Sequence, residues 1–260
     1  MNSRHLVVLV LLLSACSDGG NALQESSLNS ADKQLLATQF ARLADRQIVF
    51  AHQSVGNDVL DGVEHLAQHA QVQIPVRETR SARADDKGIV HFRVGRNEAP
   101  EEKLADFRER FSADGSSNAD LAILKLCYID FTVTTDGQAL ARKYVDVLDV
   151  LQQQHQSTRF IAVTAPLTVE QTGVKAWIKR ALGREPAGIA ENRQRNAFNA
   201  VVRSRYAPGN QLFDLAAAEA GSTETGQSLR PELASDGRHL NERGQVLVAQ
   251  ELLRVLASQP

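Results

Sequence analysis

The sequence predicts an α/β fold whose central parallel sheet is covered by helices on both faces. Short apolar segments alternate with helical patterns along the whole chain. The segment ADLAILKLCYIDF (119–131) is apolar on both faces, which is typical of a central parallel strand. With 260 residues, 43% of them hydrophobic, the chain is long enough to bury a full core.

The elements follow one another in a regular order. Ser30 is a candidate N-cap, and Asn241 is another before the last helix. The expected strands are 46–52, 72–78, 119–131, 158–166 and 211–219. The expected helices are 31–45, 58–70, 100–111, 137–155, 190–206 and 241–258. We interpret 78–97 as a polar loop and 173–188 as either a lid or an exposed helix with Trp177 as its aromatic anchor.

The first residues are predicted to be a targeting segment rather than part of the fold. Arg4 precedes an apolar run of eight residues (6–13), which suits a secretory signal and is too short to span a bilayer. The ending LSAC resembles a bacterial lipobox, so 1–15 would be removed and Cys16 lipidated. Residues 16–30 would be a flexible tether, 31–260 a single domain, and the protein a membrane-anchored lipoprotein of the bacterial cell envelope. The alternative is a plain signal peptide cut near Ala15.

Net charge, cysteine content and histidine spacing bear on nucleic-acid binding, disulfide formation and metal binding. The formal net charge is −2 and no block of five like charges occurs, so nothing favours a nucleic-acid partner. Cys127 is the second of two cysteines, and we expect it to be buried without a disulfide. His65 and His69 have a metal-compatible spacing but no evident third ligand, so we expect neither a metal nor another cofactor.

Two segments carry residues suited to acyl transfer. Ser54 follows the first predicted strand and begins a helix, where backbone N–H groups are available to an oxyanion. In LASDGRHLNERG, Asp236 precedes His239 by three residues, so one loop offers a base and the carboxylate that orients it. The alternative for Ser54 is a plain helix cap.

This arrangement resembles the SGNH (GDSL-like) hydrolase superfamily over roughly residues 45–257. The resemblance implies a three-layer α/β/α, flavodoxin-like fold with a parallel sheet of about five strands. It implies that Ser54 is the nucleophile, His239 the base and Asp236 its orienting acid. It also implies that the backbone N–H of Gly95 contributes to the oxyanion hole.

Two motifs depart from the pattern of that superfamily. The first block reads His52-Gln53-Ser54 instead of Gly-Asp-Ser, and LCYIDF lacks the asparagine of the third block. Asn57 and Asn97 are the candidates for the missing donor. For His52, contact with the serine or substrate and a structural bond to a backbone carbonyl both stay open.

The resemblance and the predicted location imply a serine esterase that hydrolyses a small-molecule or glycan ester, for which no cofactor is needed. An O-acyltransferase and a non-catalytic binding lipoprotein are the alternatives. Five arginines near the predicted loop are candidates for binding an anionic substrate, although such a run is more often solvated surface: Arg77, Arg80, Arg83, Arg93 and Arg96.

Overall fold

The structure is a computed structural model that describes residues 30–80, 86–112, 119–220 and 227–260. The predicted signal peptide, Cys16, nearly all of the predicted tether and Arg83 lie outside these residues. Within the described residues, no helix combines the length and the apolar character needed to cross a membrane.

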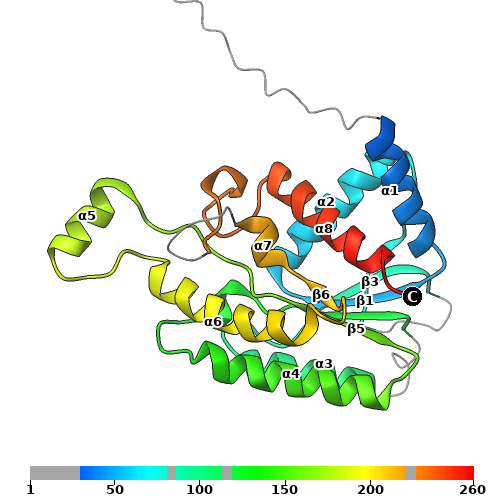
Figure 1. Ribbon diagram of the computed structural model, residues 1–260, viewed down its shortest axis with the longest axis horizontal. Helices are drawn as coiled ribbons and strands as arrows, with labels where there is room; N and C mark the ends of the chain where they lie inside the picture. Colours follow the sequence, from blue (N-terminus) through cyan, green and yellow to red (C-terminus); the bar gives the residue numbers. More distant parts are fainter. Residues whose placement is uncertain (1–29, 81–85, 113–118, 221–226) are drawn as a thin grey trace, which may run out of the picture.

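A parallel sheet of six strands forms the centre of the molecule (Figure 1). The strands are β1 Gln47–His52, β2 Val76–Glu78, β3 Gly88–Arg93, β4 Leu121–Leu124, β5 Arg159–Val163 and β6 Leu212–Phe213. Their order is β2-β3-β1-β4-β5-β6, so β1 is central. Every residue of β1 and β4 is buried, as expected for strands covered on both faces.

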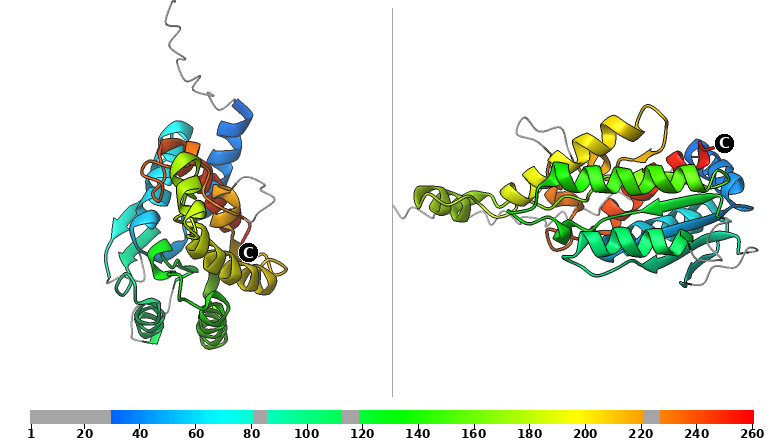
Figure 2. Two further views of the ribbon diagram at one scale, coloured as in Figure 1. Left: turned by 90° about the vertical axis from the view of Figure 1, so that its left-hand side faces the viewer. Right: turned by 90° about the horizontal axis from the view of Figure 1, so that it is seen from below.

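Helices form a layer on each side of the sheet (Figures 1 and 2). They are α1 Ser30–Leu43, α2 Ser54–Ala70, α3 Pro100–Ser112, α4 Gly137–Gln154, α5 Gly173–Ala181, α6 Ile189–Tyr206, α7 Leu215–Glu219 and α8 Glu242–Ala257, with short 3₁₀ turns η1 Tyr128–Asp130 and η2 Pro231–Leu233. Ile48 and Phe50 of β1 face a core with α1, α2, α7 and α8, whereas Val49 and Ala51 face one with α3, α4 and α6. This alternation gives the three-layer architecture that the resemblance implied.

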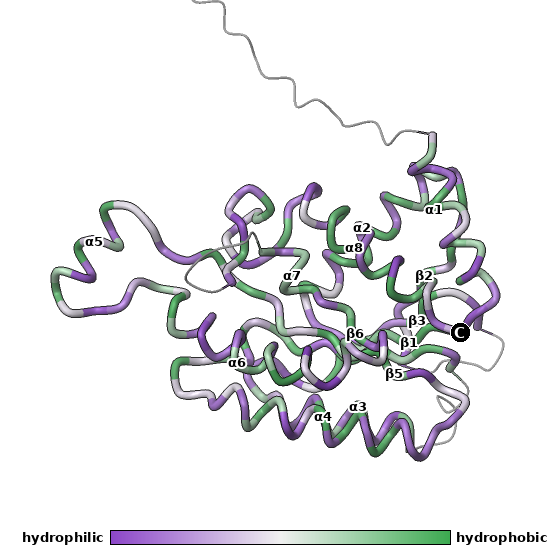
Figure 3. Tube along the Cα trace, in the orientation of Figure 1, coloured by the Kyte–Doolittle hydropathy of each residue, from purple (hydrophilic) through white to green (hydrophobic). Residues whose placement is uncertain are grey.

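Along the helices hydrophilic and hydrophobic residues alternate, as expected when one side of a helix packs on the sheet and the other faces solvent (Figure 3). Cys127 is buried and free, as the sequence predicted. Stability therefore comes from the two apolar cores rather than from a disulfide between described residues.

The interpretation of 78–97 as a polar loop was wrong, because this segment contains β3. Gly88–Arg93 pairs in parallel with β1 in full register, from Gln47 opposite Gly88 to His52 opposite Arg93. Ile89, Val90 and Phe92 are buried there. The charged residues on both sides of GIVHFR hid a strand whose side chains alternate between the two cores. In contrast, β2 is a three-residue edge strand.

Helices α2 and α8 pack closely, and both begin next to predicted site residues: α2 at Ser54 and α8 shortly after His239. A Cβ atom on Gly62 would lie 2.1 Å from the backbone oxygen of Gln245. Glycine is therefore required where the two helices cross.

The core also holds two buried ionisable side chains, Glu219 and Lys125. Glu219 of α7 is fully buried, and one of its carboxylate oxygens accepts the Leu167 N–H at 2.8 Å. Burial raises the pKa of Glu219 to about 8. Lys125 is also buried and donates to the carbonyl of Leu126, and burial lowers its pKa.

We expect Gly62→Ala to lower the free energy of unfolding by about 1–3 kcal/mol, because the added methyl group forces α2 away from α8. Urea unfolding measures the change. Gly209→Ala is the control, since its nearest contact, 3.2 Å away, is the end of the Gln211 side chain. Equal stability of the two variants would contradict the close approach of the helices.

We expect Glu219 to make the protein less stable as the pH rises. Its ordinary pKa is 4.5 and its folded pKa about 8, so over this range only the folded state keeps the proton. Its contribution to stability is full below about pH 4.5 and declines until about pH 8. Glu219→Gln, which cannot ionise, should remove this part of the decline in urea unfolding across that range. The exposed Glu232→Gln should keep the wild-type slope, and identical slopes for all three proteins would contradict the assignment.

Candidate active site

Ser54 lies at the central junction of the sheet, where β1 ends and α2 begins. The N-cap residue of α2 is Gln53, in an extended conformation, and Ser54 is the first helical residue. The Gln53 side chain does not cap the helix but donates to the carbonyls of Val94 at 2.8 Å and Gly95 at 3.2 Å. The interpretation of Ser54 as the helix cap therefore does not hold.

The structure brings Ser54, His239 and Asp236 together across 185 residues of sequence. The Oγ of Ser54 lies 3.0 Å from Nε2 of His239, and Nδ1 of His239 lies 2.8 Å from Oδ2 of Asp236. Because a carboxylate only accepts, Nδ1 carries the proton in neutral His239 and Nε2 accepts the serine O–H. This is the tautomer in which an imidazole removes a serine proton.

Asp236 is held by its own loop. Its Oδ1 accepts the backbone N–H groups of Arg238 at 2.9 Å and His239 at 2.8 Å. The tight turn depends on Gly237, whose φ of +83° is a conformation that glycine favours. The hydrogen bonds from the ring and backbone of His239 lower the pKa of Asp236 to about 2, so this carboxyl is ionised at neutral pH.

A helical side chain that sequence reasoning missed anchors the histidine loop. Asp58 of α2, one turn after Ser54, accepts the Leu240 N–H at 3.0 Å. Burial raises the pKa of Asp58. The spacing of four residues from Ser54 was an available signal, since it places both side chains on one side of the helix. The ring of Tyr128 packs edge-on against His239, with centroids 5.7 Å apart.

The predicted oxyanion role of Gly95 is not supported. Its φ is +50°, and its N–H donates to Oδ2 of Asp106 in α3 at 2.6 Å. A donor already bound to a carboxylate is not available to an oxyanion. The sequence could not reveal this bond, because it depends on the packing of α3 beside the loop after β3.

A hydrogen bond orients the side chain of Asn97, whereas no described residue orients that of Asn57. The amide oxygen of Asn97 accepts from Nζ of Lys103 at 3.0 Å, which leaves its NH₂ group as the outward donor. Lys103 is fully buried and binds both oxygens of the buried Asp130, at 2.7 and 2.8 Å. Asn57 lies half-buried in the first turns of α2 and makes no side-chain hydrogen bond to another described residue.

His52 takes the structural role that the sequence left open. The ring is fully buried, with Nδ1 2.8 Å from the Gln53 carbonyl and Nε2 3.0 Å from Nδ1 of His91. Burial lowers the pKa of His52 to about 3, so it is neutral at ordinary pH. The carbonyl requires a proton on Nδ1 of His52, and His91 must therefore donate to its Nε2. The His52 ring packs against Gly56 in the first turn of α2 and so supports the turn that carries Ser54.

The arginines proposed to meet an anionic substrate are paired with carboxylates of the protein. The described pairs are Arg77 with Asp86, Arg80 with Asp106, Arg93 with Glu78 and Arg96 with Glu102. The outcome favours the alternative interpretation of a solvated charged surface. Arg83 is outside the described residues.

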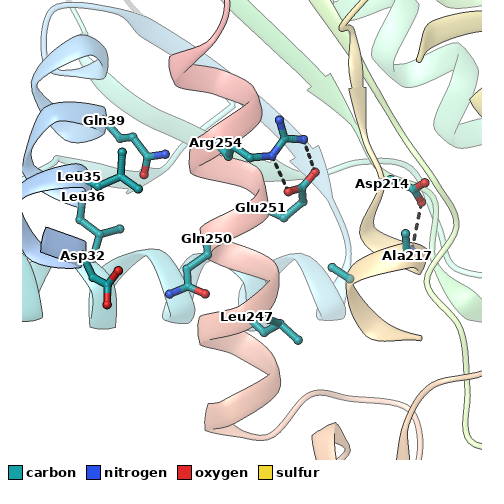
Figure 4. A pocket seen from close by; sticks show the side chains of 11 residues that line it. Asp32, Leu35, Leu36, Gln39, Asp214, Ala217, Leu247, Gln250, Glu251 and Arg254 are labelled. Carbon is teal, nitrogen blue, oxygen red and sulfur yellow. Dashed lines mark hydrogen bonds and ion pairs between the residues drawn. The ribbon is translucent and has the colours of Figure 1, made fainter. Parts of the chain in front are cut away.

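Among the described residues, no group of three or more His, Cys, Asp or Glu side chains could hold a metal ion. A groove between α1, α7 and α8 is lined by residues such as Leu35, Leu247 and the Glu251–Arg254 ion pair (Figure 4). None of the predicted catalytic residues lines it.

The fold matches solved structures at low sequence identity. A GDSL-like lipase from Bacteroides thetaiotaomicron VPI-5482 is 14% identical, with a TM-score of 0.50, over 87% of this chain and 97% of that one. A phospholipase A1 from Streptomyces albidoflavus NA297 is 15% identical, with a TM-score of 0.45, over 84% of this chain and 100% of that one. The periplasmic domain of a lipopolysaccharide acetyltransferase from Salmonella ser. Paratyphi A is 11% identical, with a TM-score of 0.47, over 90% and 98%.

The first of these structures carries the assignment of the fold. No protein-family model matches the sequence, and no curated protein matches it significantly. The match of the lipase to this chain and the parallel sheet found here agree with the resemblance seen in the sequence. The chain thus has the α/β/α fold of the GDSL-like (SGNH) hydrolases.

Proposed function

We propose that this protein is a serine hydrolase that cleaves an ester through Ser54, His239 and Asp236. The observation that carries the proposal is the continuous chain of hydrogen bonds from Ser54 Oγ through His239 to Asp236. A serine that only capped a helix would need neither an aligned imidazole nor a carboxylate behind it. The three residue types stand in the order and geometry of a nucleophile, a base and an orienting acid.

The proposed reaction has two steps, acylation of Ser54 and release of the acyl group by water. Ser54 Oγ attacks the ester carbonyl while His239 Nε2 takes its proton, and His239 then gives that proton to the leaving alcohol. Water, activated by the same imidazole, releases the acyl group from Ser54. Asp236 stays ionised and stabilises the imidazolium. The first N–H of α2 and the NH₂ group of Asn97 are the donors that we assign to the oxyanion.

We also propose a location and a substrate class. The lipobox-like LSAC ending supports lipidation of Cys16 and attachment to a membrane of the bacterial envelope. A small acyl group on an envelope glycan is the substrate class that this location favours. The same residues serve an acyltransferase if a sugar hydroxyl replaces water, and product analysis with and without a sugar acceptor separates the two reactions.

We expect a fluorophosphonate probe to add once to the wild-type protein, at Ser54, as measured by intact mass. Ser54→Ala should give no adduct, because the attacking oxygen is gone. His239→Ala should react far more slowly, because no base takes the proton. Ser235→Ala is a matched control in the histidine loop and should react at nearly the wild-type rate, since its hydroxyl donates only to the His239 carbonyl. If the wild-type protein forms no adduct, the proposed catalysis is contradicted and the alternative of a non-catalytic binding protein is favoured.

We expect Asn97→Ala to lower the rate of fluorophosphonate labelling by about two to three orders of magnitude, as loss of an oxyanion donor does in other enzymes. Asn57→Ala should change it little, because no described residue fixes the orientation of that amide. The thermal midpoints of both variants control for stability. A large loss in Asn57→Ala with none in Asn97→Ala would reverse the assignment of the donor.

A further inference from the structure

A helical arm extends from the body of the molecule between β5 and α6. Its helix, α5 (Gly173–Ala181), lies at the outer end of this excursion and away from the sheet, as Figure 1 and the right-hand view of Figure 2 show. The predicted lid is therefore not closed over Ser54, and the alternative of an exposed helix describes the structure. Closure over Ser54 therefore does not account for the exposed surface of the arm.

One side of α5 exposes large apolar side chains to solvent. Val174, Trp177 and Ile178 of the helix are 73%, 69% and 45% exposed, and Leu182, just after it, is 67% exposed. Spacings of three and four residues place them on one face. Ala176 is the only buried residue of α5.

Positive charge accompanies this apolar face. Residues 173–184 contain four cations and no acid: Lys175, Lys179, Arg180 and Arg184. Within the described residues, none of the four forms an ion pair. The acids at the base of the arm are already engaged, since Glu185 pairs with Arg193 and Glu170 accepts from Asn192.

The end of the helix is well defined by its local bonds. Gly183 has a φ of +68°, its N–H donates to the Arg180 carbonyl, and the Arg184 N–H donates to the Lys179 carbonyl. This is a Schellman motif, which terminates a helix. The exposed face therefore belongs to a helix with a defined end.

The base of the arm is joined to the histidine loop. The Val169 N–H donates to the Gly237 carbonyl at 2.9 Å, between Asp236 and His239. Thr168 is bonded to the buried Arg195 and Asn192 of α6. The base of the arm therefore lies beside the histidine loop, while α5 projects outward from it.

We propose that the α5 arm docks on an anionic lipid surface. The apolar face would enter the boundary between headgroups and acyl chains, while the flanking lysines and arginines meet lipid phosphates. This occupant satisfies both features of the arm, because it supplies apolar contact and negative charge together. A second copy of the chain would have to bring its own acids to four unpaired cations, and a closed lid would have to fold back from the observed position.

Trp177 provides a direct test, since it is the only tryptophan of the chain. We expect its fluorescence in the full-length protein to shift to shorter wavelength with vesicles of phosphatidylglycerol and phosphatidylcholine. Brominated lipids should quench it, and high salt should weaken the shift. Phosphatidylcholine vesicles alone should give a much smaller change. Because the signal comes from α5, binding through the N-terminal segment does not mimic it.

Matched variants separate charge at the arm from charge elsewhere. Lys175→Glu, Lys179→Glu and Arg180→Glu together should abolish the shift. Lys33→Glu, Arg142→Glu and Arg243→Glu together change the net charge equally and should retain it. Ser54→Ala should also retain it, so failure of the proposed catalysis and failure of the proposed docking are distinguishable.

Three results would overturn the proposal. The first is no shift with anionic vesicles, or the same shift with phosphatidylcholine alone. The second is a shift that depends on protein concentration without lipid, which would indicate self-association. The third is a shift produced by fluorophosphonate labelling without lipid, which would indicate closure over the site.

Discussion

The close junction between β1 and α2 is the constraint on which the candidate site depends. β1 ends at His52 and α2 begins at Ser54, so only Gln53 joins the strand to the helix. Both Gln53 and His52 hold this turn in place. The Gln53 side chain bonds to the carbonyls that follow β3, and the His52 ring lies under the first turn of α2. Only glycine fits above that ring, since a Cβ atom on Gly56 would lie 2.2 Å from it. The serine therefore stands on a rigid support rather than on a mobile loop.

His239 lies next to Ser54 because helices α2 and α8 pack against each other. Attraction between the loops that carry the two residues is not the main cause. The α2–α8 contact fixes where the final helix begins, and Asp58 then holds the loop before it through Leu240. A single 3.0 Å bond between a hydroxyl and an imidazole could not bring together segments 185 residues apart. Apolar packing supplies that free energy, and the polar contacts select the final orientation.

The parts of this structure that were predictable from sequence depend on local pattern. Ser54 and the Asp236–His239 pair were predictable because each stands at the boundary of a strong strand or helix. The β3 strand was missed because charged neighbours concealed six residues of alternation. The partner of the Gly95 N–H could not be predicted and the role of His52 stayed open, since each depends on a side chain of another element, Asp106 of α3 in one case and His91 of β3 in the other.

One buried carboxylate connects the loop that follows β3 with the loop that follows β4. Asp130 accepts from Lys103, from the Cys127 N–H after β4 and from the Glu98 N–H after β3, so it connects two loops at the carboxyl edge of the sheet. Burying such a pair is costly unless its hydrogen bonds are satisfied, and here the carboxylate has a donor from each loop and from Lys103. Through Lys103 the same group orients the Asn97 amide. In the proposed mechanism, this orientation lets Asn97 on the loop after β3 serve in place of the asparagine that LCYIDF lacks after β4.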